Sequence, residues 1–203
     1  MDAPAALQSQ GAAPVARRTR LTTLAVMGVT AVIILVVAVL VNQPPASADG
    51  LTAVTLSGEA TGAAPTVGQP APDFAATTVD GKAVRLSDFK GQPVWLTFGA
   101  SWCQPCRAEN PDIKATAEKY ADAGLVVLAV FISEDEAAVK DYADRVGLDY
   151  LKVADPATKL ASQYRILGIP SHYFIDREGV LQTMKIGSLD IPTMEAAVEG
   201  IQR

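Results

Sequence analysis

The residues best suited to chemistry in this chain are two cysteines three positions apart, Cys103 and Cys106, with Gln104 and Pro105 between them. The chain has no other cysteine, so no further structural disulfide can form. A pair at this spacing can bind a metal, hold a covalent haem or exchange disulfides. We therefore asked which of these three the rest of the sequence permits.

Metal and haem binding both lack ligands. A structural zinc site needs about four Cys or His ligands, and the chain offers two cysteines and a single histidine, His172. Covalent haem attachment needs His directly after the second Cys, and Arg107 stands there. We predict no metal and no bound cofactor, and interpret the pair as a redox-active disulfide.

The elements around the cysteines favour the same chemistry. An apolar run at 94–98 predicts a buried strand, and a helical pattern covers 105–121. The motif thus lies at a helix N-terminus, where free N–H groups and the helix dipole stabilise a thiolate. We assign Cys103 as the nucleophile, at the more open end, and Cys106 as the more buried resolving thiol. A permanent structural disulfide is the alternative, but closing so short a loop stabilises little.

The N-terminus predicts a membrane anchor. Residues 1–20 end in a basic cluster and are expected to form a cytoplasmic tail, and 21–41 run without a charge. About 20 apolar residues cross a bilayer, and arginines on the N-terminal side alone place the rest of the chain outside the cytoplasm. A cleaved signal peptide, cut after Ala48, stays open, although its apolar region is normally only about 7–15 residues long.

The remainder predicts a linker and one domain. Residues 42–66 are rich in Pro, Ala, Gly, Ser and Thr, typical of a flexible spacer, with a weak strand signal at 54–56. From residue 67 to 203, strand and helix patterns alternate, which predicts an α/β domain with at least one parallel strand pair. Hairpins are expected around 80–81 and 176–179, and further helices at 135–146, at 156–164 and from Pro192.

Charge excludes one class of partner. The formal net charge is −5, and residues 1–20 carry +2, so the rest of the chain carries −7. An acidic body lacks the basic face that nucleic acid requires.

Three segments carry a family resemblance. The segment FGASWCQPCRAENP at 98–111 resembles the redox segment of TlpA/ResA-like thioredoxin-family proteins, VGQPAPDF at 67–74 resembles their opening segment, and GIP at 168–170 followed by FID at 174–176 resembles their cis-proline segment. The resemblance covers residues 67–203. It implies a thioredoxin fold with a mixed sheet, helices on both faces and a preceding β-hairpin.

The resemblance also implies a biological setting. Members are tethered to the outer face of the cell membrane by a single span and pass electrons to disulfides of exported proteins, often apocytochrome c. A CcdA- or DsbD-type membrane protein supplies the electrons. We therefore expect a membrane-anchored protein-disulfide reductase.

Several residues gain a role only through the resemblance. Pro170 matches the cis-proline beside the disulfide, and Ile169 then presents its backbone to the substrate. Glu109 matches a functional carboxylate, and it shares a helix face with Cys106, although an acid in the first turns of a helix is also common without a function. The residues expected to contact substrate are Trp102, Pro105, Ile169 and Pro170. For Trp102, simple packing is the alternative.

Two positions depart from the pattern. Thr97 stands where thioredoxin has a buried acid six residues before the first cysteine, so that proton relay cannot be transferred. His172 follows Pro170 where Thr is common, and it either tunes the site or is a partly exposed strand histidine.

Other functions stay open. The same cysteines can serve an oxidase or isomerase of exported proteins, and the reduction potential separates these from a reductase. A thiol peroxidase, with antioxidant activity, is less favoured because Gly99 and Ala100 precede the motif in place of a Thr-x-x-Cys context. A non-catalytic binding module is the remaining alternative.

Overall fold

The computed structural model describes residues 26–37 and 50–202. The chain divides into two units at Ala46. In the first unit, residues 26–37 form a helix with exposed side chains, inside the apolar run predicted to span a membrane. Within the described residues, no helix has both the length and the apolar character of a membrane span. The predicted tail at 1–20 and the ends of the predicted span lie outside the described residues.

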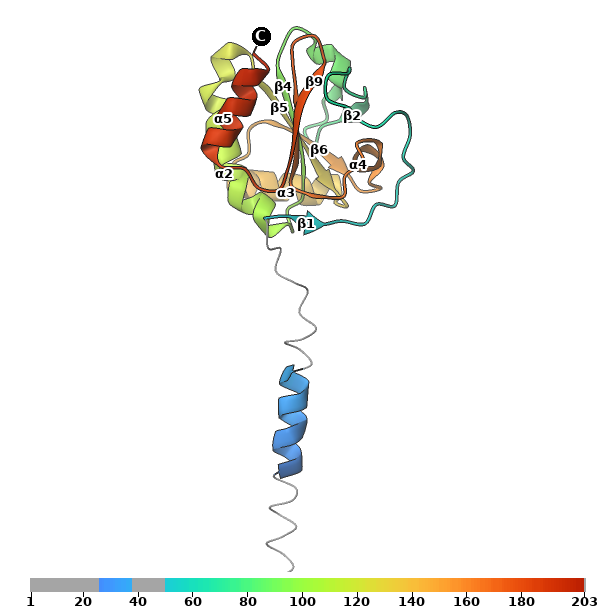
Figure 1. The fold of residues 1–203 in the computed structure, drawn as a ribbon, viewed down its shortest axis with the longest axis vertical. Helices are drawn as coiled ribbons and strands as arrows, with labels where there is room; N and C mark the ends of the chain where they lie inside the picture. The colour runs from blue at the N-terminus through green and yellow to red at the C-terminus, as the bar shows by residue number, and fades with distance from the viewer. Residues whose placement is uncertain (1–25, 38–49, 203) are drawn as a thin grey trace, which may run out of the picture. The chain divides into compact units, whose positions relative to one another are not determined.

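The second unit is built on a five-stranded mixed sheet (Figure 1). The strand order is β6 (Leu151–Asp155), β5 (Val126–Ile132), β4 (Val94–Gly99), β8 (Ser171–Ile175) and β9 (Leu181–Ile186). Strands β4, β5 and β6 are parallel, whereas β8 and β9 run antiparallel to their neighbours. The expected mixed sheet with a parallel pair is confirmed.

Side chains alternate across β4, so both faces of the sheet are apolar and need cover. Trp95 belongs to a cluster with the helices α2 (Gln104–Lys119), α3 (Glu136–Val146) and α5 (Ile191–Gly200). Leu96 and Phe98 belong to a second cluster, which includes residues next to and within the short helix α4 (Lys159–Gln163). Helices therefore cover both faces, as expected, and two 3₁₀ turns, Leu86–Phe89 and Ala121–Ala123, complete the helical elements of this unit.

The predicted hairpin before the sheet is present. Strands β2 (Ala75–Thr77) and β3 (Ala83–Arg85) pair antiparallel around the turn at Asp80 and Gly81. The helix expected at 156–164 is shorter, because it begins only at Lys159. Asp155 explains the late start, since its carboxylate accepts hydrogen bonds from the N–H groups of Lys159 and Ala161 at 2.7 and 2.9 Å.

The folded unit also begins earlier than the expected boundary at residue 67. A two-residue strand, β1 (Thr52–Ala53), pairs antiparallel with β7 (Gly168–Ile169), with Thr52 opposite Ile169. We call residues 50–58 the strap. Val54 and Leu56 of the strap pack against the core cluster of Phe98. This part of the predicted flexible spacer is therefore docked on the domain, because alternate side chains along it are apolar and find a core to cover.

Candidate functional site

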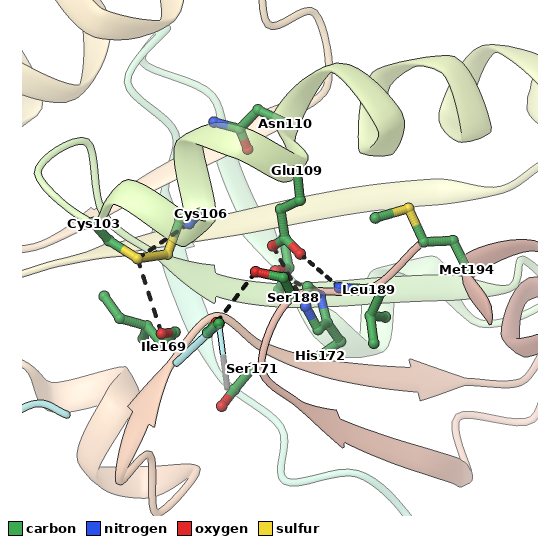
Figure 2. A network of polar contacts seen from close by, with 12 residues as sticks. Cys103, Cys106, Glu109, Asn110, Ile169, Ser171, His172, Ser188, Leu189 and Met194 are labelled. Atoms are coloured by element: carbon green, nitrogen blue, oxygen red, sulfur yellow. Dashed lines mark hydrogen bonds and ion pairs between the residues drawn. A yellow bond between two sulfur atoms is a disulfide. The ribbon is translucent and has the colours of Figure 1, made fainter. Parts of the chain in front are cut away.

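The two cysteines form a disulfide at the start of α2 (Figure 2). Their Cα atoms are 5.3 Å apart, within the usual range for a disulfide. Cys103 is the N-cap of α2, and its sulfur accepts a hydrogen bond from the Cys106 N–H at 3.2 Å. Pro105 occupies the first turn, where its missing N–H costs nothing. The helix N-terminus thus directs its partial positive charge at Cys103, as the sequence predicted.

One expectation about the cysteines is wrong in this oxidised state. Cys103 was expected to be the more open of the two, yet it is 1% exposed and Cys106 is 4% exposed. The cause is the strap: the Thr52 hydroxyl lies 3.8 Å from Cys103 Sγ. The Ile169 carbonyl oxygen lies 3.9 Å from the same sulfur on the side of β7.

The residues expected to contact substrate surround Cys103. The Ile169–Pro170 peptide bond is cis, as the family resemblance implied. Ile169 is fully buried and presents its carbonyl to the sulfur. Trp102 is 48% exposed, so about half of its surface is free to contact a substrate. Pro105 is half-buried beside it. The described residues contain no cluster of three or more metal-ligating side chains.

Glu109 lies on the same face of α2 as Cys106 and is buried (Figure 2). Its Oε2 accepts a hydrogen bond from the Leu189 N–H at 3.1 Å, and its Oε1 lies 3.5 Å from His172 Nε2. The predicted proximity of Glu109 and the cysteines is therefore present. Burying a carboxylate without polar partners is costly, and the Leu189 N–H and His172 are the partners that Glu109 has here.

His172 is fully buried behind Glu109, so it is not a partly exposed strand histidine. The Trp95 indole Nε1 lies 3.3 Å from His172 Nδ1. Because an indole N–H can only donate, Nδ1 must accept, and the neutral ring carries its hydrogen on Nε2. Glu109 Oε1 lies 3.5 Å from Nε2, yet Nε2 makes no hydrogen bond within the described residues. The Thr97 hydroxyl, 3.1 Å from Nδ1, must then also donate to it. Trp95 thus fixes the tautomer that His172 presents to Glu109.

A small cavity connects the carboxylate with the thiol side of the site. Its volume is about 10 Å³, and its lining includes Thr97, Cys106 and Glu109. This is about the smallest cavity that can hold one water molecule. Most of its lining is apolar, and Thr97, Glu109 and Asn110 are the polar residues that a water there could contact. Burial raises the pKa of the neighbouring Tyr150, with Tyr142 and Glu109 adding to the shift, so its hydroxyl stays neutral.

Sequence reasoning missed two supporting residues. Trp95 was hidden in an apolar strand, although a fully buried Trp normally needs a partner for its N–H. Glu134, after β5, accepts hydrogen bonds from the N–H and the hydroxyl of Ser101. This carboxylate holds the loop that leads into Cys103, and no local pattern links residues so far apart in the sequence.

Together, the mixed sheet, the N-capping cysteine and the cis-proline define a thiol–disulfide oxidoreductase of the thioredoxin fold. The comparisons with known proteins agree. The chain belongs to the AhpC/TSA family, which matches residues 67–184, and it is a TlpA/ResA-like member of the thioredoxin group.

Relatives of known name include thiol-disulfide oxidoreductases and a thioredoxin-like protein. A thiol-disulfide oxidoreductase ResA of Bacillus cereus is 31% identical over 135 residues, which are 66% of this chain and 78% of the relative. The thioredoxin-like protein YneN of Bacillus subtilis (strain 168) is 34% identical over 134 residues, 65% of this chain and 78% of that protein. A crystal structure of a putative thiol:disulfide interchange protein DsbE from Chlorobium tepidum superposes with a TM-score of 0.64 at 30% identity, covering 69% of this chain and 100% of that chain.

Proposed function

We propose that this enzyme is an extracytoplasmic, membrane-anchored reductase of disulfides in exported proteins, for example apocytochrome c. The observation that carries the redox role is Cys103 at the N-cap of α2, with its sulfur accepting the Cys106 N–H. The extracytoplasmic setting is supported by the uncharged run at 21–41 behind the basic cluster that ends at Arg20. A CcdA- or DsbD-type membrane protein is the proposed electron donor, on the strength of the family resemblance.

The reaction runs in two exchanges. The Cys103 thiolate attacks one sulfur of a substrate disulfide, forming a mixed disulfide and releasing the first substrate thiolate. Cys106 then attacks Cys103 Sγ, which closes the protein disulfide and releases the second substrate thiolate. The substrate gains two electrons and the enzyme loses two, so an external dithiol must reduce the enzyme before the next turnover.

Glu109 serves the second exchange in this proposal. Cys106 must lose its proton to attack, and Glu109 is the carboxylate that shares its helix face and the small cavity beside it. His172, with its hydrogen held on Nε2 by Trp95, stabilises the carboxylate and positions it. Trp102, Pro105, Ile169 and Pro170 surround the place where the substrate sulfur arrives.

The reduction potential tests the direction of electron flow. Equilibration of the purified full-length protein with a glutathione redox series should give a value near thioredoxin's, about −270 mV. A value near that of a strong oxidant, about −120 mV, would reverse the proposal in favour of an oxidase. Consumption of hydrogen peroxide by the reduced protein, at a rate exceeding that of its exchange with protein disulfides, would favour the peroxidase alternative.

The setting is tested separately in cells. We expect fractionation to find the full-length chain in the membrane, with the folded unit sensitive to protease added from the outside. Sensitivity only after the cytoplasm is opened would contradict the extracytoplasmic proposal.

A further inference from the structure

The strap lies along β7 beside Cys103, at the edge where an incoming polypeptide would have to bind. Its first residue is fixed by Ser188, whose N–H and hydroxyl donate to the Gly50 carbonyl at 3.1 and 3.2 Å. Further along, the Val54 N–H donates to the Leu167 carbonyl at 3.3 Å. At its end, the N–H groups of Ser57 and Gly58 both donate to the Thr158 hydroxyl, at 2.8 and 3.0 Å.

Between these fixed ends, the strap follows the backbone edge just before Pro170. Thr52 stands opposite Ile169, and Ala53 opposite Gly168. Thr52 is turned toward the site, with its hydroxyl 3.8 Å from Cys103 Sγ, whereas Ala53 is exposed. With the strap in place, Cys103 is 1% exposed. A substrate sulfur must come within bonding distance of Cys103 Sγ, about 2.05 Å, and the strap lies beside that sulfur.

Gly168 shows how closely the strap fits this edge. A Cβ atom built there would lie 2.8 Å from Leu51 Cδ1 and 2.9 Å from Leu51 Cγ. The Leu51 side chain therefore rests on the bare backbone of Gly168, in space that any larger residue would fill. Beside this contact, Leu167 is 81% exposed and Trp102 is 48% exposed, so the edge has an apolar rim that the strap leaves uncovered.

We propose that the strap is an internal stand-in for the substrate chain, and that its register shows how a substrate binds. An extended segment would pair antiparallel with Gly168 and Ile169, as β1 does. Its reactive cysteine would take the place of Thr52, and an apolar residue just before that cysteine would take the place of Leu51 on Gly168. The residue after the cysteine would face solvent, as Ala53 does. This inference rests on the proposed function, and it names the substrate class as an extended apolar-Cys segment that displaces the strap.

Cross-linking tests the register. In Thr52→Cys, the new thiolate can attack Cys103 Sγ of the existing disulfide, which forms a bond from position 52 to Cys103 and releases the Cys106 thiolate. The number of thiols is unchanged, so no oxidant is required. After acid quenching and alkylation of the full-length protein, peptide mapping should find this bond at least about tenfold more often than in the matched control Ala53→Cys. Equal linking in the two variants would overturn the register.

Gating is tested by the rate at which dithiothreitol reduces the disulfide. Leu51→Ser removes the apolar contact on Gly168, and a loss of about 1.4 kcal/mol corresponds to a tenfold change in the open population. We expect reduction to be about tenfold faster in Leu51→Ser than in the wild type, and unchanged in the exposed control Ala53→Ser. Identical rates in all three proteins would overturn the gate, and a melting curve shows that Leu51→Ser is folded.

Substrate preference is tested with peptides that carry their cysteine as a mixed disulfide with thionitrobenzoate, whose release is coloured. The reduced enzyme should consume a Gly-Leu-Cys-Ala peptide about tenfold faster than Gly-Asp-Cys-Ala, because an acid on the Gly168 edge would lose its hydration. Equal rates would contradict the proposal that the substrate carries an apolar residue directly before its reactive cysteine.

The outcomes for the strap and for the proposed function are distinguishable. Cross-linking at position 52 and faster reduction in Leu51→Ser, together with an oxidising potential, would support the role of the strap and contradict the proposed reductase function. A reducing potential with no effect of either strap variant would support the reductase function and contradict the proposed role of the strap.

Discussion

The two sulfurs of one disulfide face different kinds of surroundings. Cys103 is covered by main chain and by a short strap held at its two ends and along β7. Cys106 faces buried side chains of the core, including Glu109, beside a cavity of about 10 Å³. A cover made of a short chain segment can leave and be replaced by another chain, whereas a wall of packed side chains stays in place. The difference suits attack on a large substrate at Cys103 and proton transfer at Cys106.

The largest expected effect comes from replacing each of the two cysteines by serine, one at a time. Cys103→Ser should lower turnover of a peptide mixed disulfide by at least about a thousandfold, since the attacking atom is lost. Cys106→Ser should still release one equivalent of thiol and then stop as a stable mixed disulfide. Mass spectrometry of the trapped species checks this assignment. A trapped adduct on Cys106 in Cys103→Ser would invert the roles of the two cysteines.

Glu109→Gln should slow the second exchange by about a hundredfold, because general base catalysis contributes at least that much. The first exchange at Cys103 should keep its rate. Stopped-flow measurement of the two phases separates them. Glu118→Gln is the matched control, an exposed acid on the same helix. Equal slowing of both phases would show that Glu109 supports the fold of the site and not one step.

Trp95→Phe should have a smaller effect, about threefold on the second exchange, with about 1 kcal/mol lost from the free energy of unfolding because one buried hydrogen bond is removed. The diagnostic measurement is the ¹⁵N spectrum of His172. In the wild type, the ring should carry its hydrogen on Nε2, and in Trp95→Phe a second tautomer should appear. An unchanged spectrum would mean that Trp95 does not fix the ring.

The smallest effect is expected far from both sulfurs, at Asp73. Burial tends to raise the pKa of Asp73, but hydrogen bonds from the Ser87 N–H and hydroxyl and the charge of Arg85 outweigh it, so the pKa lies below the ordinary 3.8. Its contribution to stability is therefore present above that value and is lost as the pH falls through the lower pKa of the folded state. The side chain is 44% exposed, so screening limits the contribution.

Asp73→Asn should accordingly cost about 0.5 kcal/mol at pH 7. Urea unfolding of the variant and the wild type should show this difference shrinking as the pH falls from 6 to 3, with no change in either exchange rate. A loss of exchange activity in Asp73→Asn would mean that stability and chemistry are coupled across the molecule.

The sequence predicted those parts of the fold that depend on local pattern. The apolar run at 94–98 becomes β4, and the hairpin expected around Asp80 and Gly81 forms. The cis-proline at Pro170 and the proximity of Glu109 to the redox pair followed from a resemblance spread over several segments. Each of these features needs only neighbouring residues or a recurring motif to be recognised.

What could not be predicted depends on pairing between distant segments. A strand was expected at 54–56, but the observed strand is Thr52–Ala53, because β7 and the Gly168 surface decide which residues pair. The orientation of His172 depends on Trp95, on another strand of the sheet. No local sequence pattern indicates that the strap pairs with β7 or that His172 contacts Trp95, so only the assembled fold shows these contacts.

The strap also affects how far the folded unit can move from the proposed membrane anchor. If residues 21–41 anchor the chain as proposed, only residues 42–49 separate the anchor from the docked strap, a contour of about 26 Å when fully extended. Releasing the strap, residues 50–58, would lengthen that tether to about 56 Å. The displacement that uncovers Cys103 would thus also change the length of chain between the anchor and the folded unit, which is short with the strap docked and long with the strap released.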